Sequence, residues 1–359
     1  MRITCPILTL VTVLAPLAAV ASPPTLKAFP GMISLSLEGQ TLEGRPIAWT
    51  GGEVHLLGRD GRLWDFAPNK ARNWRKAGSR FQPYSISQLR AELLRELGRG
   101  FSVSGTGHYV VAHPVGERNR WPQRFEDLYR SFVHYFSVRG FKLKEPDVPL
   151  IGVVCGDRRQ FARYTSAPPG VLGFYSLRTN RITLYDISRA EGFADWHKTD
   201  KTILHEATHQ AAFNTGIHSR YVAPPTWVAE GLATLFEAPG VYDSRHYPNR
   251  EDRINQSRLD DFRRLVLPQH SPELIQTLVA DDRLFRSAPG PAYAESWALT
   301  FYLVETQSRK YADYVARTAA RPPFTKYTAQ QRMADFTAVF GDNWPMLEAR
   351  LLRFIDNLP

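Results

Sequence analysis

The pentapeptide His-Glu-Ala-Thr-His at residues 205 to 209 constrains this chain more than any other feature. On a helix, His205 and His209 project from the same face, one turn apart. That spacing lets two neutral imidazole nitrogens reach one Zn²⁺ ion at about 2.0–2.1 Å. Glu206 is displaced around the helix, where its carboxylate can take a proton from a water on the metal without itself binding the metal. The alternative is a chance match in which both histidines are ordinary core residues.

A third metal ligand is expected from the segment Thr-Trp-Val-Ala-Glu-Gly-Leu at residues 226 to 232. Glu230 is the candidate, and Glu237 is the alternative carboxylate. Two histidines and one glutamate leave a fourth position open for water, which is the arrangement of catalytic rather than structural zinc. The sequence therefore predicts a zinc site formed by His205, His209 and Glu230.

Both segments carry the signals of helix ends. Thr199 or Asp200 can cap the start of the first helix, and Gly216 can end it with a left-handed turn. Thr226 directly follows two prolines and can cap the second helix. We therefore expect two helices, one carrying the histidines and one carrying Glu230.

At this point the chain resembles a known family. His-Glu-x-x-His at 205 to 209, followed by Trp-x-x-Glu-Gly-Leu-Ala at 227 to 233, is similar to the gluzincin branch of the HExxH metallopeptidases. The fit is closer to a group of exported bacterial peptidase-MA-like proteins, many of them without an assigned function. The resemblance extends with less force from residue 173 to residue 297, and weakly to the C-terminus. It implies a zincin-like fold, a zinc site and hydrolysis of peptide bonds.

Two further residues depend on this resemblance. Gluzincins often place an aspartate four residues after the ligand glutamate, where it supports a ligand histidine; here that position is Thr234. Either Thr234 or Glu237 can take its place. The resembling proteins also carry a tyrosine in the context of Tyr293, whose hydroxyl can bond the oxyanion that develops on an attacked carbonyl. The alternative is a core tyrosine packed beside Trp297.

The first residues have the pattern of a secretory signal. A positive residue, an apolar run over residues 7 to 20 and small residues before Ser22 predict a signal peptide at residues 1–21 and an exported, periplasmic or secreted protein. A membrane anchor is the alternative. Cys5 falls within this segment, so the mature chain would keep only Cys155, which excludes a framework of internal disulfides.

The formal net charge is +10, which is strongly basic. In an exported protein this charge can favour weak association with anionic envelope surfaces, such as lipopolysaccharide, acidic wall polymers or phospholipid headgroups. Compositional bias explains it equally, and we favour that explanation. Basic and aromatic residues alternate between Arg59 and Arg80, as in nucleic-acid-binding surfaces. For an exported chain a solvated face of a β-sheet is the better interpretation, so no nucleic-acid partner is expected.

The order of elements predicts an α+β fold. Residues 22–85 contain short strands separated by turn signals such as Asp60-Gly61, which indicate a small N-terminal β-rich module. Residues 86–359 are expected to form a zincin-like metallopeptidase domain: a mixed sheet, an active-site helix and a helical C-terminal half. Within that sheet, residues 181 to 185 form either an edge strand that pairs with an extended substrate or an ordinary buried strand.

These observations predict an exported, zinc-dependent metallopeptidase that acts on a peptide or protein substrate. His205, His209 and Glu230 would hold Zn²⁺, Glu206 would be the general base, and Tyr293 would stabilise the oxyanion. Two alternatives are a non-catalytic envelope binding module on the same scaffold, and a zinc hydrolase of a wall-peptide or non-peptide bond. The intact Glu206 argues against the first, because a binding module has no chemical need of that carboxylate.

Overall fold

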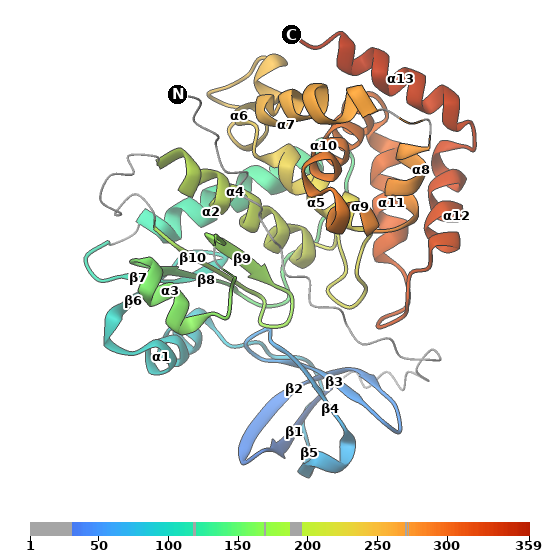
Figure 1. The fold of residues 1–359 in the computed structure, drawn as a ribbon. Helices are drawn as coiled ribbons and strands as arrows, with labels where there is room; N and C mark the ends of the chain where they lie inside the picture. The colour runs from blue at the N-terminus through green and yellow to red at the C-terminus, as the bar shows by residue number, and fades with distance from the viewer. Residues whose placement is uncertain (1–30, 118–119, 169, 187–195, 270, 272) are drawn as a thin grey trace.

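The computed structural model describes residues 31–117, 120–168, 170–186, 196–269, 271 and 273–359. The chain forms an N-terminal sheet, a second sheet with flanking helices, and a helical C-terminal half (Figure 1). This arrangement confirms the predicted α+β class. The predicted signal peptide lies outside the described residues. Among the described helices, none combines the length and apolar character that crossing a bilayer requires.

The N-terminal sheet has five antiparallel strands in the order β4-β3-β2-β1-β5. Its core is small and apolar, with Leu35, Val54 and Leu56 almost fully buried. The fifth strand lies within the basic segment from Arg59 to Arg80, and most of its residues are exposed, in keeping with the solvated sheet face expected there. The strands are β1 (Met32–Leu37), β2 (Gln40–Trp49), β3 (Val54–Gly58), β4 (Leu63–Phe66) and β5 (Ala71–Gly78).

The second sheet is mixed, with the order β6-β7-β8-β10-β9. The strands β7 and β8, which pair in parallel, are buried along their whole length, as expected when helices cover both faces of the sheet. Helices α2 (Arg120–Ser137) and α4 (Trp196–Asn214) share one face, and α1 (Ile86–Leu97) and α3 (Arg158–Tyr164) share the other. The strands are β6 (Phe101–Gly105), β7 (Tyr109–Pro114), β8 (Leu150–Cys155), β9 (Gly173–Ser176) and β10 (Arg181–Tyr185).

One sequence alternative is settled by the strand order. The strand β10 pairs in parallel with β8 and antiparallel with β9, so it is an interior strand. The edge next to α4 is β9. Of the two alternatives left open for residues 181 to 185, the edge strand is excluded and the strand within the sheet is correct.

The helical half is built around α5 (Thr226–Phe236) and α10 (Pro289–Thr306), which cross in close contact. A Cβ atom on Gly231 would lie 2.1 Å from Thr300 Oγ1 and 2.6 Å from the Ser296 carbonyl oxygen, so only glycine allows this approach. Trp227 anchors α5 by stacking on Tyr314 with 5.8 Å between ring centroids. The other helices are α6 (Pro239–Tyr242), α7 (Gln256–Asp261), α8 (Leu274–Ala280), α9 (Arg283–Ser287), α11 (Ser308–Ala319), α12 (Ala329–Phe340) and α13 (Trp344–Asp356).

The expected helix ends were partly correct. Gly216 follows α4 with a φ of +86°, as the left-handed stop requires. The start of α4 at Trp196 lies before the expected caps at Thr199 and Asp200, so that expectation was wrong. Thr226 is the first residue of α5 and not its cap; its amide donates to Asp282 Oδ1 instead.

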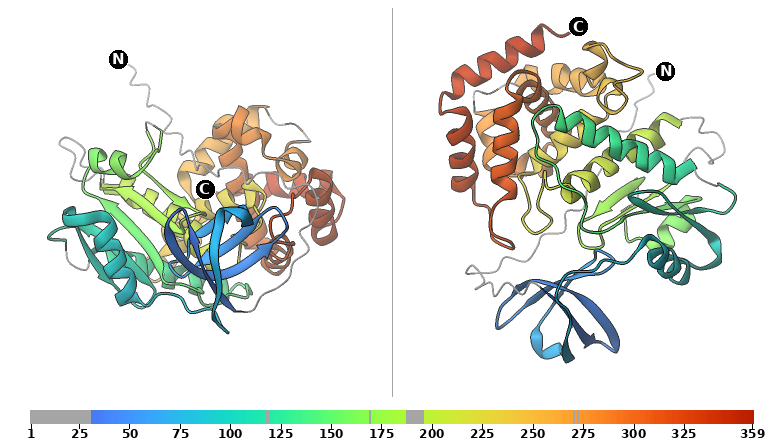
Figure 2. Two further views of the ribbon diagram at one scale, coloured as in Figure 1. Left: turned by 90° about the horizontal axis from the view of Figure 1, so that it is seen from below. Right: turned by 180° about the vertical axis from the view of Figure 1, so that it is seen from behind.

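The N-terminal sheet contacts the other two parts through the turn between β3 and β4 and through a side chain of β3. Gly61 in the turn between β3 and β4 has a φ of +84°, and its carbonyl oxygen accepts a 2.7 Å hydrogen bond from Arg220 Nη2. The same nitrogen donates to the Leu177 carbonyl at 2.8 Å, and Arg220 therefore ties this turn to the end of β9. On the other side, His55 of β3 stacks on Phe324 with 3.7 Å between ring centroids. Figure 2 shows the N-terminal sheet at one end of the molecule, beneath both the second sheet and the helical half.

Candidate metal site

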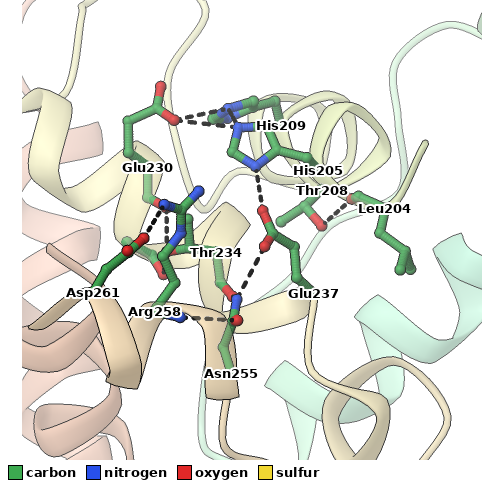
Figure 3. A network of polar contacts seen from close by, with 11 residues as sticks. Leu204, His205, Thr208, His209, Glu230, Thr234, Glu237, Asn255, Arg258 and Asp261 are labelled. Carbon is green, nitrogen blue, oxygen red and sulfur yellow. Dashed lines mark hydrogen bonds and ion pairs between the residues drawn. The ribbon is translucent and has the colours of Figure 1, made fainter. Parts of the chain in front are cut away.

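Three side chains from two helices converge at the centre of the molecule. His205 and His209 project from α4, and Glu230 projects from α5 toward both imidazoles (Figure 3). All three are at most 2% exposed. One ligand atom from each lies within 4.8 Å of the others, which is close enough to share a metal ion. The structure thus brings together the three residues that the sequence spacing predicted.

The donor atoms of this cluster fit a cation. Glu230 Oε2 lies 3.2 Å from His205 Nε2 and 3.6 Å from His209 Nε2, and the two imidazole nitrogens are 3.2 Å apart. That buried carboxylate oxygen has no hydrogen-bond partner among the described residues. Buried polar atoms without partners are costly, and two nitrogens and an oxygen are a donor set that zinc prefers. The cluster can therefore bind a metal.

A chain of hydrogen bonds behind the cluster fixes the orientation of His205. Glu237 Oε1 accepts a 2.8 Å hydrogen bond from His205 Nδ1, which leaves the Nε2 lone pair directed at the cluster. Glu237 Oε2 in turn accepts from Asn255 Nδ2 at 2.9 Å. Thr234 does not contact His205; its hydroxyl donates to the Glu230 carbonyl within its own helix. Of the two residues expected to support the histidine, Glu237 is the one that does so.

Charges around the cluster also favour a bound cation. Burial lowers the pKa of His205, but the adjacent carboxylates of Glu230 and Glu237 outweigh burial and raise this pKa to about 10. Burial raises the pKa of Glu230, but His209 and His205 outweigh it and hold the pKa well below its usual range. Two carboxylates thus stabilise positive charge on one imidazole. A divalent cation would meet the same demand without a proton.

Glu206 is separate from the ligand cluster. Its side chain is 1% exposed, and burial raises the pKa of its carboxyl group. Oε2 accepts a 2.6 Å hydrogen bond from the backbone N–H of Tyr175 on β9, and Oε1 has no partner among the described residues. One oxygen is therefore held by the edge strand, while the other is available to accept a proton.

A buried network that the sequence did not reveal positions the edge strand relative to α4. The turn between β9 and β10 places Asn180 in a left-handed conformation, with a φ of +56°. Its side chain exchanges hydrogen bonds of 2.9 Å and 2.8 Å with Asn214, and its Oδ1 also accepts from the Tyr175 hydroxyl. Gln210 Nε2 donates to the Asn180 carbonyl at 2.8 Å. Thr179-Asn180 is a turn signal in the sequence, because asparagine tolerates the left-handed conformation. The hydrogen bonds of Asn180 with Gln210 and Asn214 could not be inferred, because those residues lie about 30 positions further along the chain.

Tyr293 lies near the start of α10 and is partly buried. The guanidinium of Arg258 lies over its ring at 5.4 Å from the centroid, and Phe285 packs edge-on at 5.4 Å. Burial raises the pKa of Glu237, but the hydrogen bond with His205 and then the charge of Arg258 outweigh burial and lower this pKa. Tyr293 is thus linked through Arg258 to the polar side of the metal cluster, and its role in catalysis stays a prediction.

A comparison with protein-family models finds a match in the region that contains the cluster, to a family whose function is not known. A family model described as "Protein of unknown function (DUF1570)" matches residues 200–325, which include all three cluster residues. No curated protein matches the chain.

Among solved structures, the chain is similar to a mutant M1 zinc metallopeptidase from Deinococcus radiodurans bound to a Tyr-Ser-Ala substrate. The two share 13% sequence identity with a TM-score of 0.35. The match covers 73% of this chain and 52% of the other, so this chain spans about half the length of that enzyme.

Proposed function

We propose that the protein is an exported zinc-dependent metallopeptidase. The observation that carries the proposal is the buried cluster of His205, His209 and Glu230 with the separate carboxylate of Glu206 beside it. A structural zinc site uses four protein ligands and has no need of a further buried carboxylate. Three ligands and a neighbouring base are what a hydrolytic site requires.

In this proposal each residue of the site has a separate role in hydrolysis. Zinc held by His205, His209 and Glu230 would supply Lewis acidity toward a substrate carbonyl and toward water. Glu206 takes the proton of the attacking water on Oε1 and returns it to the leaving amine. The Tyr175 N–H holds the other oxygen of Glu206, so that the carboxylate faces one direction. The Tyr293 hydroxyl stabilises the oxyanion.

The experiment compares the parent protein with Glu206→Gln, and uses Glu251→Gln at an exposed position as the control. Each is incubated with a mixed peptide library, cleavage is read by mass spectrometry, and zinc is measured on the same samples. We expect equal zinc in all three and a loss of about 10²–10⁴-fold in cleavage rate for Glu206→Gln only.

Other outcomes identify other functions. Zinc-loaded parent protein that cleaves wall fragments or simple esters but not peptides would make it a hydrolase of another bond. No cleavage of any of these would indicate a binding module. Equal cleavage by parent and Glu206→Gln would refute the role given to Glu206.

Export is part of the proposal. It is supported by the basic start, the apolar run and the small residues that precede Ser22. N-terminal sequencing of material collected outside the cytoplasm should give a first residue near Ser22. An intact Met1 would contradict export by a cleaved signal.

A further inference from the structure

A pocket of about 170 Å³ lies at the C-terminal end of α4, beyond the metal cluster. All three parts of the molecule contribute to its wall: β3 of the N-terminal sheet, the segments before β8 and after α4, and the end of α11. The residues that matter here are Leu57, Lys144, His218, Arg220, Tyr221 and Ala319. Neither the catalytic proposal nor the metal cluster uses this pocket.

Arg220 brings an uncompensated positive charge to the pocket. It is 7% exposed, and none of the ion pairs within the described parts of the chain includes it. Its Nη2 donates to two backbone carbonyls, and its Nε has no partner among the described residues. Buried charges are normally paired, because an isolated charge loses its hydration and gains nothing in return. The charge of this guanidinium is therefore without an anionic partner among the described residues.

His218 adds a second unsatisfied group on the same wall. It is 1% exposed, and neither ring nitrogen has a hydrogen-bond partner in the described structure. Burial, followed by the charge of nearby His209, lowers its pKa to about 3, so the ring is neutral at physiological pH. A neutral imidazole offers one N–H donor. His218 thus lines the pocket, close enough to the metal cluster to feel the charge of His209, and its N–H donor has no partner among the described residues.

Lys144 at the pocket wall makes the local charge more positive. Its side chain is 59% exposed and lies 3.9 Å from Asp147 Oδ2. That same oxygen is 3.2 Å from Arg45 Nη2, so one carboxylate serves two cations. With Arg220 included, the pocket and its rim carry more positive than negative charge. An anion is the ligand that this arrangement favours.

We propose that this pocket binds the C-terminal carboxylate of a peptide that reaches the metal cluster. This inference rests on the proposed function. The planar guanidinium of Arg220 suits a carboxylate, and a cavity of about 150 Å³ is large enough for benzene, so a pocket of this size accepts a terminal residue. The N-terminal sheet closes the pocket through Leu57 and holds Arg220 through the Gly61 carbonyl. The enzyme would then favour short peptides and cleave near their C-termini.

The test measures binding rather than turnover. The Glu206→Gln variant of the full mature chain is titrated calorimetrically with acetyl-trialanine as the free acid and as the carboxamide, which differ only in the terminal charge. We expect the acid to bind at least about tenfold more tightly, the value of one hydrogen bond to a charged group. Equal affinity for acid and amide would overturn the proposal.

Variants locate the preference. In the Glu206→Gln background, Arg220→Met should abolish the difference between acid and amide. Because Arg220 also supports the docked turn, Lys144→Gln provides a second variant at an exposed position that folding does not need. It should reduce the difference by about twofold to fivefold, and Lys142→Gln, an exposed lysine outside the pocket, should leave it unchanged. Full preference in both pocket variants would place the carboxylate elsewhere.

Two further arms separate this inference from the proposed function. Sodium acetate competing with the peptide acid would show that the pocket takes a carboxylate from any source, and that a peptide chain is not required. A parent protein that prefers the acid yet cleaves nothing would refute the catalytic proposal alone. A parent protein that cleaves acid and amide substrates with equal kcat/KM would refute the carboxylate pocket alone.

Discussion

At the scale of single residues, the support of His205 comes from further along the chain than the family pattern places it. Thr234, four residues after Glu230, is too short and bonds within its helix. Glu237 lies seven residues after Glu230, which returns to nearly the same helix face after two turns. Its longer side chain reaches Nδ1 of His205. The supporting carboxylate thus lies about one turn beyond the position that the gluzincin resemblance predicts.

The ligand and its support should differ in how strongly they affect metal affinity. Glu230→Ala removes a donor atom and should abolish stoichiometric zinc binding. Glu237→Gln removes only the charge that orients His205, and losses of this kind are about 10–100-fold in affinity. Zinc competition with a chelating dye measures both. If Glu237→Gln lost the metal while Glu230→Ala kept it, the two roles would be exchanged.

The residues gathered at the cluster were predictable, but their surroundings were not. The two histidines and Glu206 lie on one helix, so their relative positions follow from helical spacing alone. Asn255 and Asn180 contact the site through tertiary packing, from positions tens of residues away in sequence. Helical periodicity carries no information about such partners.

At the scale of elements, the close crossing of α5 and α10 holds Glu230 in place. Gly231→Ala would put a methyl group against Thr300 Oγ1 and the Ser296 carbonyl, at 2.1 Å and 2.6 Å. We expect it to destabilise the fold by about 1–3 kcal/mol, and by more where the helices cannot separate. Gly290→Ala, in α10, would bring a methyl group only against the flexible end of Leu265 at 3.3 Å and should be nearly neutral. Urea unfolding measures the stability of both variants. If Gly231→Ala were as stable as Gly290→Ala, the close crossing of α5 and α10 would be contradicted.

A second element-scale prediction concerns two buried carboxyl groups between α10 and α13. Burial and then Glu348 raise the pKa of Glu295 to about 8, from an ordinary value of 4.5. Between these values the folded state holds a proton that the unfolded state has lost. The free energy of unfolding therefore falls as pH rises through this window, by up to about 5 kcal/mol.

Glu295→Gln should remove this dependence, because the amide imitates the protonated carboxyl. We expect the variant and the parent protein to be similarly stable at pH 4, and the variant to be more stable at pH 9. Exposed Glu273→Gln is the control and should match the parent protein at both values. Thermal unfolding across this range measures the effect, and parallel curves for parent and Glu295→Gln would contradict it.

Elements were predictable where local pattern decides them. The long amphipathic helix α2 and the buried strand β8 follow from periodicity and from a continuous apolar run. The position of β10 within the sheet was not predictable, because strand order is set by pairing with residues far away in sequence. The bounds of β5 were not predictable, because Arg72, Arg75 and Lys76 are exposed along a sheet edge, where no apolar alternation is required.

At the scale of the whole molecule, the N-terminal sheet is attached through the turn that contains Gly61. Gly61→Ala would strain a left-handed residue and also place a methyl group 2.8 Å from Val148 Cγ2. Gly39→Ala has the same backbone strain, with a φ of +81°, and meets no atom within 4 Å. Both should lose about 1–2 kcal/mol from strain, and Gly61→Ala should lose about 1–3 kcal/mol more from the contact.

The difference between these two variants reports on docking rather than on the turn itself. Faster proteolysis between β5 and α1 in Gly61→Ala than in Gly39→Ala is the expected result. Identical proteolysis and melting of the two variants would show that the turn does not hold the N-terminal sheet in place.

The hydrogen bond from the Tyr175 backbone N–H to Glu206 has a consequence for the protonation of that carboxylate. The Tyr175 amide hydrogen is held by Glu206 Oε2, yet it lies on the open edge of β9, where an added strand would need it. An extended chain that pairs at Tyr175 must therefore displace the carboxylate. Losing that donor removes a contact that favours the ionised form, so the proton affinity of Glu206 rises as the chain arrives. In the proposed enzyme, addition of a substrate strand would therefore be coupled to activation of Glu206 as the base.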